Sequence, residues 1–202
     1  MKIRAFFATV ILVAAAPAFA EAGDWLVRFG GSTVMPKSDN NDTVEVDDGT
    51  MVTFNATYFF TDRWAVEVLA ALPFEHDIDL DGGSRVGSTK HLPPTVSAQY
   101  HFMPGNNVRP YVGLGVNWTE FFEEDTTGAL EGVDLELDRS VGLAAQVGLD
   151  IDINEAWFVN AEVRYIDIDT DPTVTLPSGD RLEIGDVEID PWLLGINVGF
   201  RL

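Results

Sequence analysis

Apolar and polar residues alternate along most of this 202-residue chain. In the stretch "TVSAQYHF", every second residue is apolar, namely Val96, Ala98, Tyr100 and Phe102. A period of two residues is typical of a β-strand whose two faces meet different surroundings. The same alternation predicts eight strands, at residues 25–34, 50–60, 63–72, 92–102, 109–121, 139–151, 156–166 and 191–202.

The length and spacing of these segments indicate a membrane barrel. Each holds roughly ten residues, enough for a tilted strand to cross the hydrocarbon layer, and an even number of strands suits a bacterial outer-membrane barrel. The connections after the second, fourth and sixth segments are short ("TD", "MPGNNV" and "DINE"), whereas the others are long and acidic. Such barrels have short periplasmic turns and long external loops. The expected fold is all-β: an eight-stranded antiparallel transmembrane β-barrel with both termini in the periplasm.

Aromatic residues gather where the predicted strands end. The periplasmic ends carry Tyr58, Phe60, Trp64, Tyr100, Phe102, Trp157 and Phe200. The external ends carry Phe74, Trp118, Phe121, Phe122, Tyr165 and Trp192. Two such girdles mark the two lipid interfaces of a membrane barrel. A soluble periplasmic barrel or sandwich would also show alternating apolar and polar residues. It would bury its apolar face, however, so it would not need aromatic rings at both ends of its strands.

The first twenty residues, "MKIRAFFATVILVAAAPAFA", have the parts of a secretory signal peptide. Lys2 and Arg4 precede an apolar run over 5–16, and small residues stand at Ala18 and Ala20. The run is too short to span a bilayer as a helix. We expect cleavage after Ala20, a barrel domain over residues 21–202 and a location in the outer membrane of a Gram-negative cell. The chain has no cysteine, so no disulfide framework supports it.

The formal net charge is −21, and the acidic residues gather in four blocks, at 39–48, 75–81, 123–138 and 167–190. This charge excludes nucleic acid as a partner, because phosphates would be repelled. The blocks are expected to form a solvated outer surface, or weak ligands for divalent cations that bridge to lipopolysaccharide phosphates. "DIDLDG" at 77–82 begins like a calcium loop, but its twelfth position is Ser88 instead of an acid. No dedicated metal site is predicted.

Several longer stretches resemble one family. They are "STKHLPPTVSAQYHF" (88–102), "RPYVGLGVNWTEFF" (109–122), "AAQVGLDIDINEAWFVNAEVRYIDIDT" (144–170) and "DPWLLGINVGFRL" (190–202). Together they are similar to the OmpW family of eight-stranded outer-membrane barrels, and the chain looks AlkL-like. The resemblance covers nearly all of residues 21–202. It implies passive uptake of small hydrophobic solutes through a narrow barrel, surrounded by outer-membrane lipid and without a cofactor.

The alternation also predicts which side chains face the lumen. They are Arg28, Asn55, Glu67, Leu69, Gln99, His101, Asn117, Gln146, Asp150, Asn160, Glu162, Arg164, Asn197 and Arg201. Eight strands enclose a space that side chains or one small ligand can fill, which excludes a broad water-filled pore. We therefore expect Arg28 and Glu67 to form an interior ion pair rather than a transport path, and Arg164 to pair with Glu162 or Glu67.

Two further features bear on transport. Leu69 is apolar at mid-height on the lumen face; the family resemblance makes it part of a constriction, and simple packing is the alternative. Pro93 and Pro94 are expected at the external end of the strand over 92–102, and neither can donate to a sheet ladder. Weakened pairing there would open the wall for lateral exit of a hydrophobic solute into the bilayer. The alternative is that the prolines only end the strand.

Two other functions compete with transport. A structural or surface-recognition barrel would act through its acidic external loops without moving a solute. A lipid-modifying enzyme would need a nucleophile beside a base. The three histidines, at His76, His91 and His101, have no nearby serine in a pattern that suggests such a pair. We therefore predict no enzyme, and assign His101 as a hydrogen-bonding lumen residue near the periplasmic side.

Overall fold

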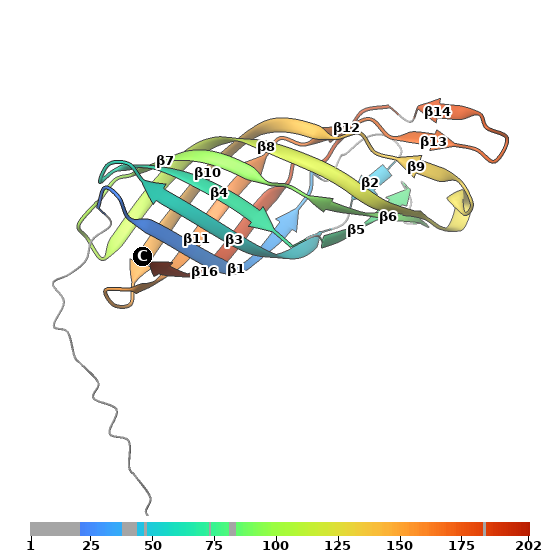
Figure 1. Cartoon of the computed structure of the whole chain (residues 1–202). Coiled ribbons are helices and arrows are strands. Elements are labelled where there is room, and N and C mark those ends of the chain that lie inside the picture. Colours follow the sequence, from blue (N-terminus) through green and yellow to red (C-terminus); the bar gives the residue numbers. More distant parts are fainter. Residues whose placement is uncertain (1–20, 38–43, 47, 73, 81–83, 184) are drawn as a thin grey trace, which may run out of the picture.

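A computed structural model describes residues 21–37, 44–46, 48–72, 74–80, 84–183 and 185–202. Its centre is an antiparallel β-barrel of eight strands (Figure 1). They are β1 (Trp25–Met35), β3 (Gly49–Phe59), β4 (Trp64–Ala71), β7 (Thr95–His101), β8 (Val108–Thr126), β10 (Ser140–Asp152), β11 (Trp157–Ile166) and β16 (Trp192–Arg201). β10 pairs with both β11 and β8, which closes the ring. The predicted fold class is confirmed.

Burial alternates along the barrel strands, as the sequence pattern predicts. On β4, Glu67 and Leu69 are 0% and 1% exposed, whereas Val68 between them is 47% exposed. Every residue expected in the lumen is buried. Because successive side chains of a strand point to opposite faces, the wall is apolar outside and largely polar inside.

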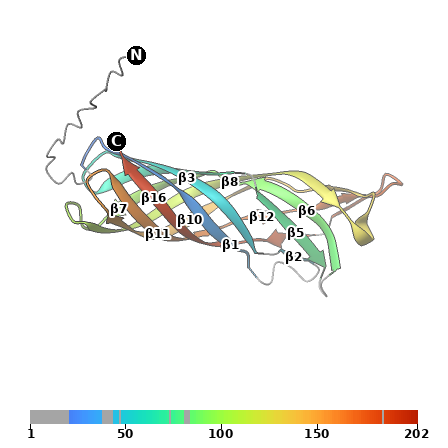
Figure 2. The same ribbon diagram turned by 90° about the horizontal axis from the view of Figure 1, so that it is seen from below.

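Beyond the barrel, the chain forms additional strands at the end opposite the chain termini (Figures 1 and 2). β2 (Val44–Val46), β5 (Phe74–Leu80) and β6 (Ser84–Leu92) extend the barrel wall. β9 (Asp134–Glu136), β13 (Thr173–Thr175) and β14 (Arg181–Glu183) form a separate sheet, and β12 (Asp169–Thr170) pairs with β15 (Val187–Glu188). A short 3-10 turn, η1, covers Gly128–Leu130. Much of the acidic sequence, expected only as loops, is therefore β-structure.

The strand expected over 92–102 is divided at its prolines into two segments. β6 ends at Leu92 and β7 begins at Thr95, so only Pro93 and Pro94 separate the two strands. Both segments pair with the same continuous strand, since β8 runs on to Thr126. The backbone N–H of Trp118 still donates to the carbonyl of Pro94, at 2.9 Å. The prolines remove donors but keep acceptors, so β7 ends beside them, as one of the two alternatives predicted, while pairing with β8 resumes at Leu92.

Aromatic side chains ring both ends of the barrel. At the periplasmic end, ring centroids are 5.0 Å apart in each of three pairs: Trp25–Tyr58, Trp64–Tyr100 and Trp157–Phe200. At the outer end Trp118 is 46% exposed and Trp192 is 53% exposed. Phe121 departs from the expected girdle, because it packs against an interior apolar cluster. Consecutive residues of a strand face opposite sides, so Phe121 and Phe122 cannot both face lipid.

Some expectations fall outside the described residues. These are the signal peptide over 1–20, most of the acidic block over 39–48, and the end of the calcium-like stretch at 81–82. Among the residues that are described, no helix has the length and hydrophobicity needed to cross a membrane.

Candidate functional site

The middle of the lumen holds buried, paired charges. Arg28 donates from Nη1 to Glu67 Oε2 at 3.1 Å. It also binds Asp150 through two parallel bonds, Nε to Oδ1 at 3.3 Å and Nη2 to Oδ2 at 3.0 Å. All three side chains are fully buried. The interior ion pair expected between Arg28 and Glu67 therefore forms, and it extends to a third residue.

Arg164 on β11 joins the same group, and it reaches Glu67 on β4 from the opposite side of the barrel. Its Nη2 lies 2.7 Å from Glu67 Oε1 and 3.3 Å from Glu162 Oε2. It also donates to Gln146 Oε1 at 2.7 Å. Arg164 thus pairs with both of the carboxylates that the sequence offered as alternatives. We call the five ionisable residues Arg28, Glu67, Asp150, Glu162 and Arg164 the ion network.

Amide side chains complete the hydrogen bonding of Glu67. Gln99 Nε2 donates to its Oε2 at 2.7 Å, and Gln146 Nε2 donates to its Oε1 at 3.1 Å. Buried charges are tolerable only when such partners replace water. Because members of the ion network come from β1, β4, β10 and β11 and are at most 5% exposed, their side chains fill the barrel at this level.

An aromatic and apolar layer lies on the periplasmic side of the ion network. Leu26, Phe59, Ala65 and Phe158 form a buried cluster. The ring of His101 lies 4.7 Å from Phe59 and 4.9 Å from Tyr111. Its Nε2 is 3.2 Å from Gln99 Oε1, which confirms the hydrogen-bonding place expected for this histidine.

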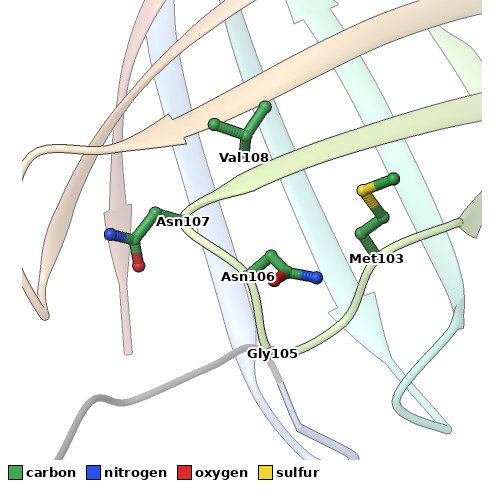
Figure 3. A pocket seen from close by; sticks show the side chains of 5 residues that line it. All are labelled: Met103, Gly105, Asn106, Asn107 and Val108. Carbon is green, nitrogen blue, oxygen red and sulfur yellow. The ribbon is translucent and has the colours of Figure 1, made fainter.

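The periplasmic mouth carries a second, smaller set of charges. Arg109 and Arg201 both pair with Asp152, and Arg201 also donates to the carbonyl of Glu155. The nearby turn between β7 and β8 has a hollow of about 480 Å³ (Figure 3). The described residues that line it are Met103, Gly105, Asn106, Asn107 and Val108, and none of these five has an ionisable side chain.

An apolar layer lies on the outer side of the ion network. We call this cluster the outer apolar layer: Val34, Met51, Ala71, Ala144, Ile166, Ile168, Val187, Ile189 and Leu193. Three of its members, Ile168, Val187 and Ile189, come from the connection between β11 and β16 and cover the strand residues from outside. Leu69 is buried on β4 between Glu67 and Ala71, so it stands between the ion network and this layer.

The wall beside the outer apolar layer has an interruption, which we call the seam. Pairing of β4 with β7 runs as far as Leu69 with Thr95, and pairing of β5 with β6 begins at Phe74 with His91. No pair of described residues joins these two stretches. The seam is bordered by Ala71 on one side and by Pro93 and Pro94 on the other. Of the two prolines, Pro93 is buried and Pro94 half-buried.

The missing donors of the two prolines face different neighbours. In an antiparallel strand, the N–H and C=O of one residue point to the same neighbouring strand, and those of the next residue point to the other. The carbonyl of Pro94 accepts from Trp118 on β8. The nitrogen of Pro94 therefore faces β8, and that of Pro93 faces β4 across the seam.

Two interior residues, Tyr111 and Arg109, were not predicted from the sequence. Tyr111 donates to Glu162 Oε2 at 3.1 Å and accepts from Asn160 at 3.1 Å, so it braces the ion network. Arg109 is also fully buried. The signal was present, because the alternation that places Asn117 in the lumen places Tyr111 and Arg109 on the same face.

Three carboxylates meet outside the membrane span. The side chains of Asp167, Asp169 and Asp190 bring their oxygens within 4.8 Å of one another, a spacing that could hold a cation. Desolvation, together with the charges of Asp190 and Asp167, raises the pKa of Asp169. The triad lies in the segment that carries Ile168 and Ile189 into the outer apolar layer.

Comparison with known proteins agrees with this architecture. A family model described as the OmpW family matches residues 21–202. Outer membrane protein W of Vibrio cholerae serotype O1 is 43% identical over 211 residues, which cover 96% of each chain. The crystal structure of OprG from Pseudomonas aeruginosa has a TM-score of 0.82 and 37% identity, covering 90% of this chain and 97% of that one. The solid-state NMR structure of AlkL in lipid bilayers has a TM-score of 0.72 and 27% identity, covering 97% of each.

Proposed function

Because the chain belongs to the OmpW family of outer-membrane proteins, we propose that it takes up small hydrophobic solutes passively. In this proposal the solute enters from outside, reaches the outer apolar layer and leaves sideways into the bilayer through the seam. No cofactor or catalytic step is involved. The signal peptide over 1–20, with cleavage after Ala20, is part of the same proposal.

One observation carries the proposal: the outer apolar layer lies directly above buried charges and directly beside an interrupted wall. Ala71 belongs to the layer and also borders the seam. Below it, Arg28, Glu67 and Arg164 occupy the centre of the lumen. An apolar solute gains by leaving water for the layer, but it would disrupt paired charges if it continued along the barrel axis. The seam is then the path of lower free energy.

Specific roles follow for the residues around this path. In this proposal Leu69 is the inner boundary of the path, since it stands between the outer apolar layer and the ion network. Glu67, Glu162, Arg28 and Arg164 hold that boundary closed. Pro93 and Pro94 keep the seam unpaired, because neither offers an amide hydrogen.

The acidic outer segments suggest how the protein contacts lipopolysaccharide and divalent cations. Outer-membrane lipid surrounds any protein of this family, and lipopolysaccharide phosphates lie at the level of the external strands. Because carboxylates and phosphates repel each other, we propose that divalent cations bridge them weakly. Calcium titration of the protein in lipopolysaccharide bilayers, compared with phospholipid bilayers, tests this point: equal calcium binding in both contradicts bridging.

The second candidate function is surface recognition without transport. The β9, β13 and β14 sheet stands beyond the barrel and is largely exposed, which favours contact with an external partner. Uptake into proteoliposomes that carry lipopolysaccharide in their outer leaflet separates the two functions. The transport proposal expects faster entry of an apolar probe than in protein-free vesicles and no change for a small polar probe. An unchanged rate for the apolar probe would favour recognition.

A further inference from the structure

Arg164 has hydrogen-bonding capacity that the ion network does not use. Its Nη2 serves all three acceptors, Glu67, Gln146 and Glu162. Its Nε and Nη1 have no partner among the described residues. Arg28 differs, since each of its three nitrogens donates to a side chain. Arg164 is only 1% exposed, so bulk water does not reach the unused N–H groups.

The position of Arg164 indicates which molecule these N–H groups could contact. In the sheet register, Arg164 is paired with Leu193 on β16, and the next inward-facing residue toward the outside on β11 is Ile166. Leu193 and Ile166 both belong to the outer apolar layer. Arg164 therefore lies where the apolar layer meets the ion network, at the inner end of the space that an apolar solute would occupy.

We propose that Arg164 determines specificity by donating a hydrogen bond to one neutral acceptor oxygen of an otherwise apolar solute. A ketone or ester carbonyl at the inner end of a hydrocarbon has this chemistry. The inference rests on the proposed uptake function and narrows its substrate class. An unmet buried donor favours a ligand that supplies an acceptor over one that leaves the donor unpaired.

The surrounding charges favour a neutral acceptor over a carboxylate. The ion network holds two arginines, Arg28 and Arg164, and three carboxylates, on Glu67, Asp150 and Glu162. With ordinary ionisation this gives a local charge of −1, so an added anion would meet repulsion in a poorly solvated place. The acidic outer segments repel anions on the way in as well.

Three probes of equal chain length separate these possibilities: nonane, 2-nonanone and nonanoate. Proteoliposomes with lipopolysaccharide in the outer leaflet report the uptake rate of each. Infrared spectroscopy of 2-nonanone bound to the protein reports the hydrogen bond directly, because the carbonyl stretch falls to lower wavenumber when the oxygen accepts from a guanidinium.

The matched variants are Arg164→Lys and Arg181→Lys. Lysine at position 164 keeps the positive charge. Its ammonium group has three N–H donors, and the three acceptors of Arg164 Nη2 would occupy them all, so none is left for a solute. Arg181 is 64% exposed on β14 and controls for the chemical change itself. We expect the wild type to prefer 2-nonanone over nonane by about tenfold, which is what one net hydrogen bond gives. Arg164→Lys should bring the ratio close to one, and Arg181→Lys should leave it unchanged.

The spectra distinguish failure of this inference from failure of the transport proposal. A lowered carbonyl stretch in the wild type that is absent in Arg164→Lys supports the hydrogen bond, even if no probe enters faster than in protein-free vesicles. An unshifted stretch in the wild type overturns the inference, and this measurement needs no folded variant. A preference for nonanoate over 2-nonanone also overturns it.

Discussion

Arg164 and Glu67, 97 positions apart in the chain, meet at 2.7 Å between Nη2 and Oε1 in the middle of the barrel. Both side chains are at most 1% exposed. Removing one partner of a buried ion pair leaves an uncompensated charge. We expect Arg164→Met to lower the free energy of unfolding by about 3–5 kcal/mol, measured by urea titration in lipid or detergent.

A second ion pair of the same length provides the control. Arg181 Nη2 also lies 2.7 Å from a carboxylate, Glu136, but these side chains are 64% and 70% exposed. Arg181→Met should therefore cost no more than about 1 kcal/mol. Equal losses for the two methionine variants would show that burial of the Arg164 pair does not matter for stability.

The prolines at the seam give a directional prediction. The nitrogen of Pro93 faces β4 across the seam, so Pro93→Thr adds an amide hydrogen that can extend the pairing and close it. Uptake of an apolar probe should then slow severalfold, while uptake of a polar probe should not change. Vesicle assays with both probes measure this.

Pro94→Val is the matched control for that variant. Its new amide would face Trp118 on β8, where the wall is already paired. It should leave apolar uptake as in the wild type. Equal slowing of apolar and polar probes by Pro93→Thr would count against lateral exit, because it would indicate a general constriction.

The sequence predicted the barrel well because lipid and lumen impose opposite polarity on alternate residues. That pattern placed Glu67 and Arg164 in the interior and suggested their pairing. It could not show that Glu67 binds two arginines, since the contacts come from strands far apart in the chain and depend on register. It also missed the continuation of pairing beyond Pro93, because proline signals a lost donor on its own strand and says nothing about how far β8 extends.

Replacement by alanine should affect two glycines of the barrel to different extents. At Gly199 an added Cβ would lie 2.1 Å from Cζ of Phe158, a ring that is itself fully buried. At Gly31 the nearest atom would be 3.7 Å away, in ordinary contact. We expect Gly199→Ala to destabilise the barrel by about 1–3 kcal/mol through overpacking. Gly31→Ala should stay within about 0.5 kcal/mol of the wild type. Urea midpoints compare them, and a tolerated Gly199→Ala would mean that Phe158 can move.

The carboxylate triad predicts that the stability of the connection between β11 and β16, which covers the outer end of the barrel, depends on pH. Desolvation and the charges of Asp190 and Asp167 raise the pKa of Asp169, so the folded state holds its proton more tightly than the unfolded chain does. Stability from this residue is therefore present at low pH and is lost as pH rises from the ordinary aspartate range through the raised pKa.

The amide of Ile189, which donates to the carbonyl of Ile168 at 2.8 Å, reports on this segment. Its hydrogen exchange, corrected for the intrinsic rate, should show stronger protection near pH 4 than at pH 7. Asp169→Asn should flatten that difference, whereas Glu131→Gln, which removes a charge outside the triad, should not. A wild-type pH dependence in Asp169→Asn would show that repulsion within the triad does not weaken the cover.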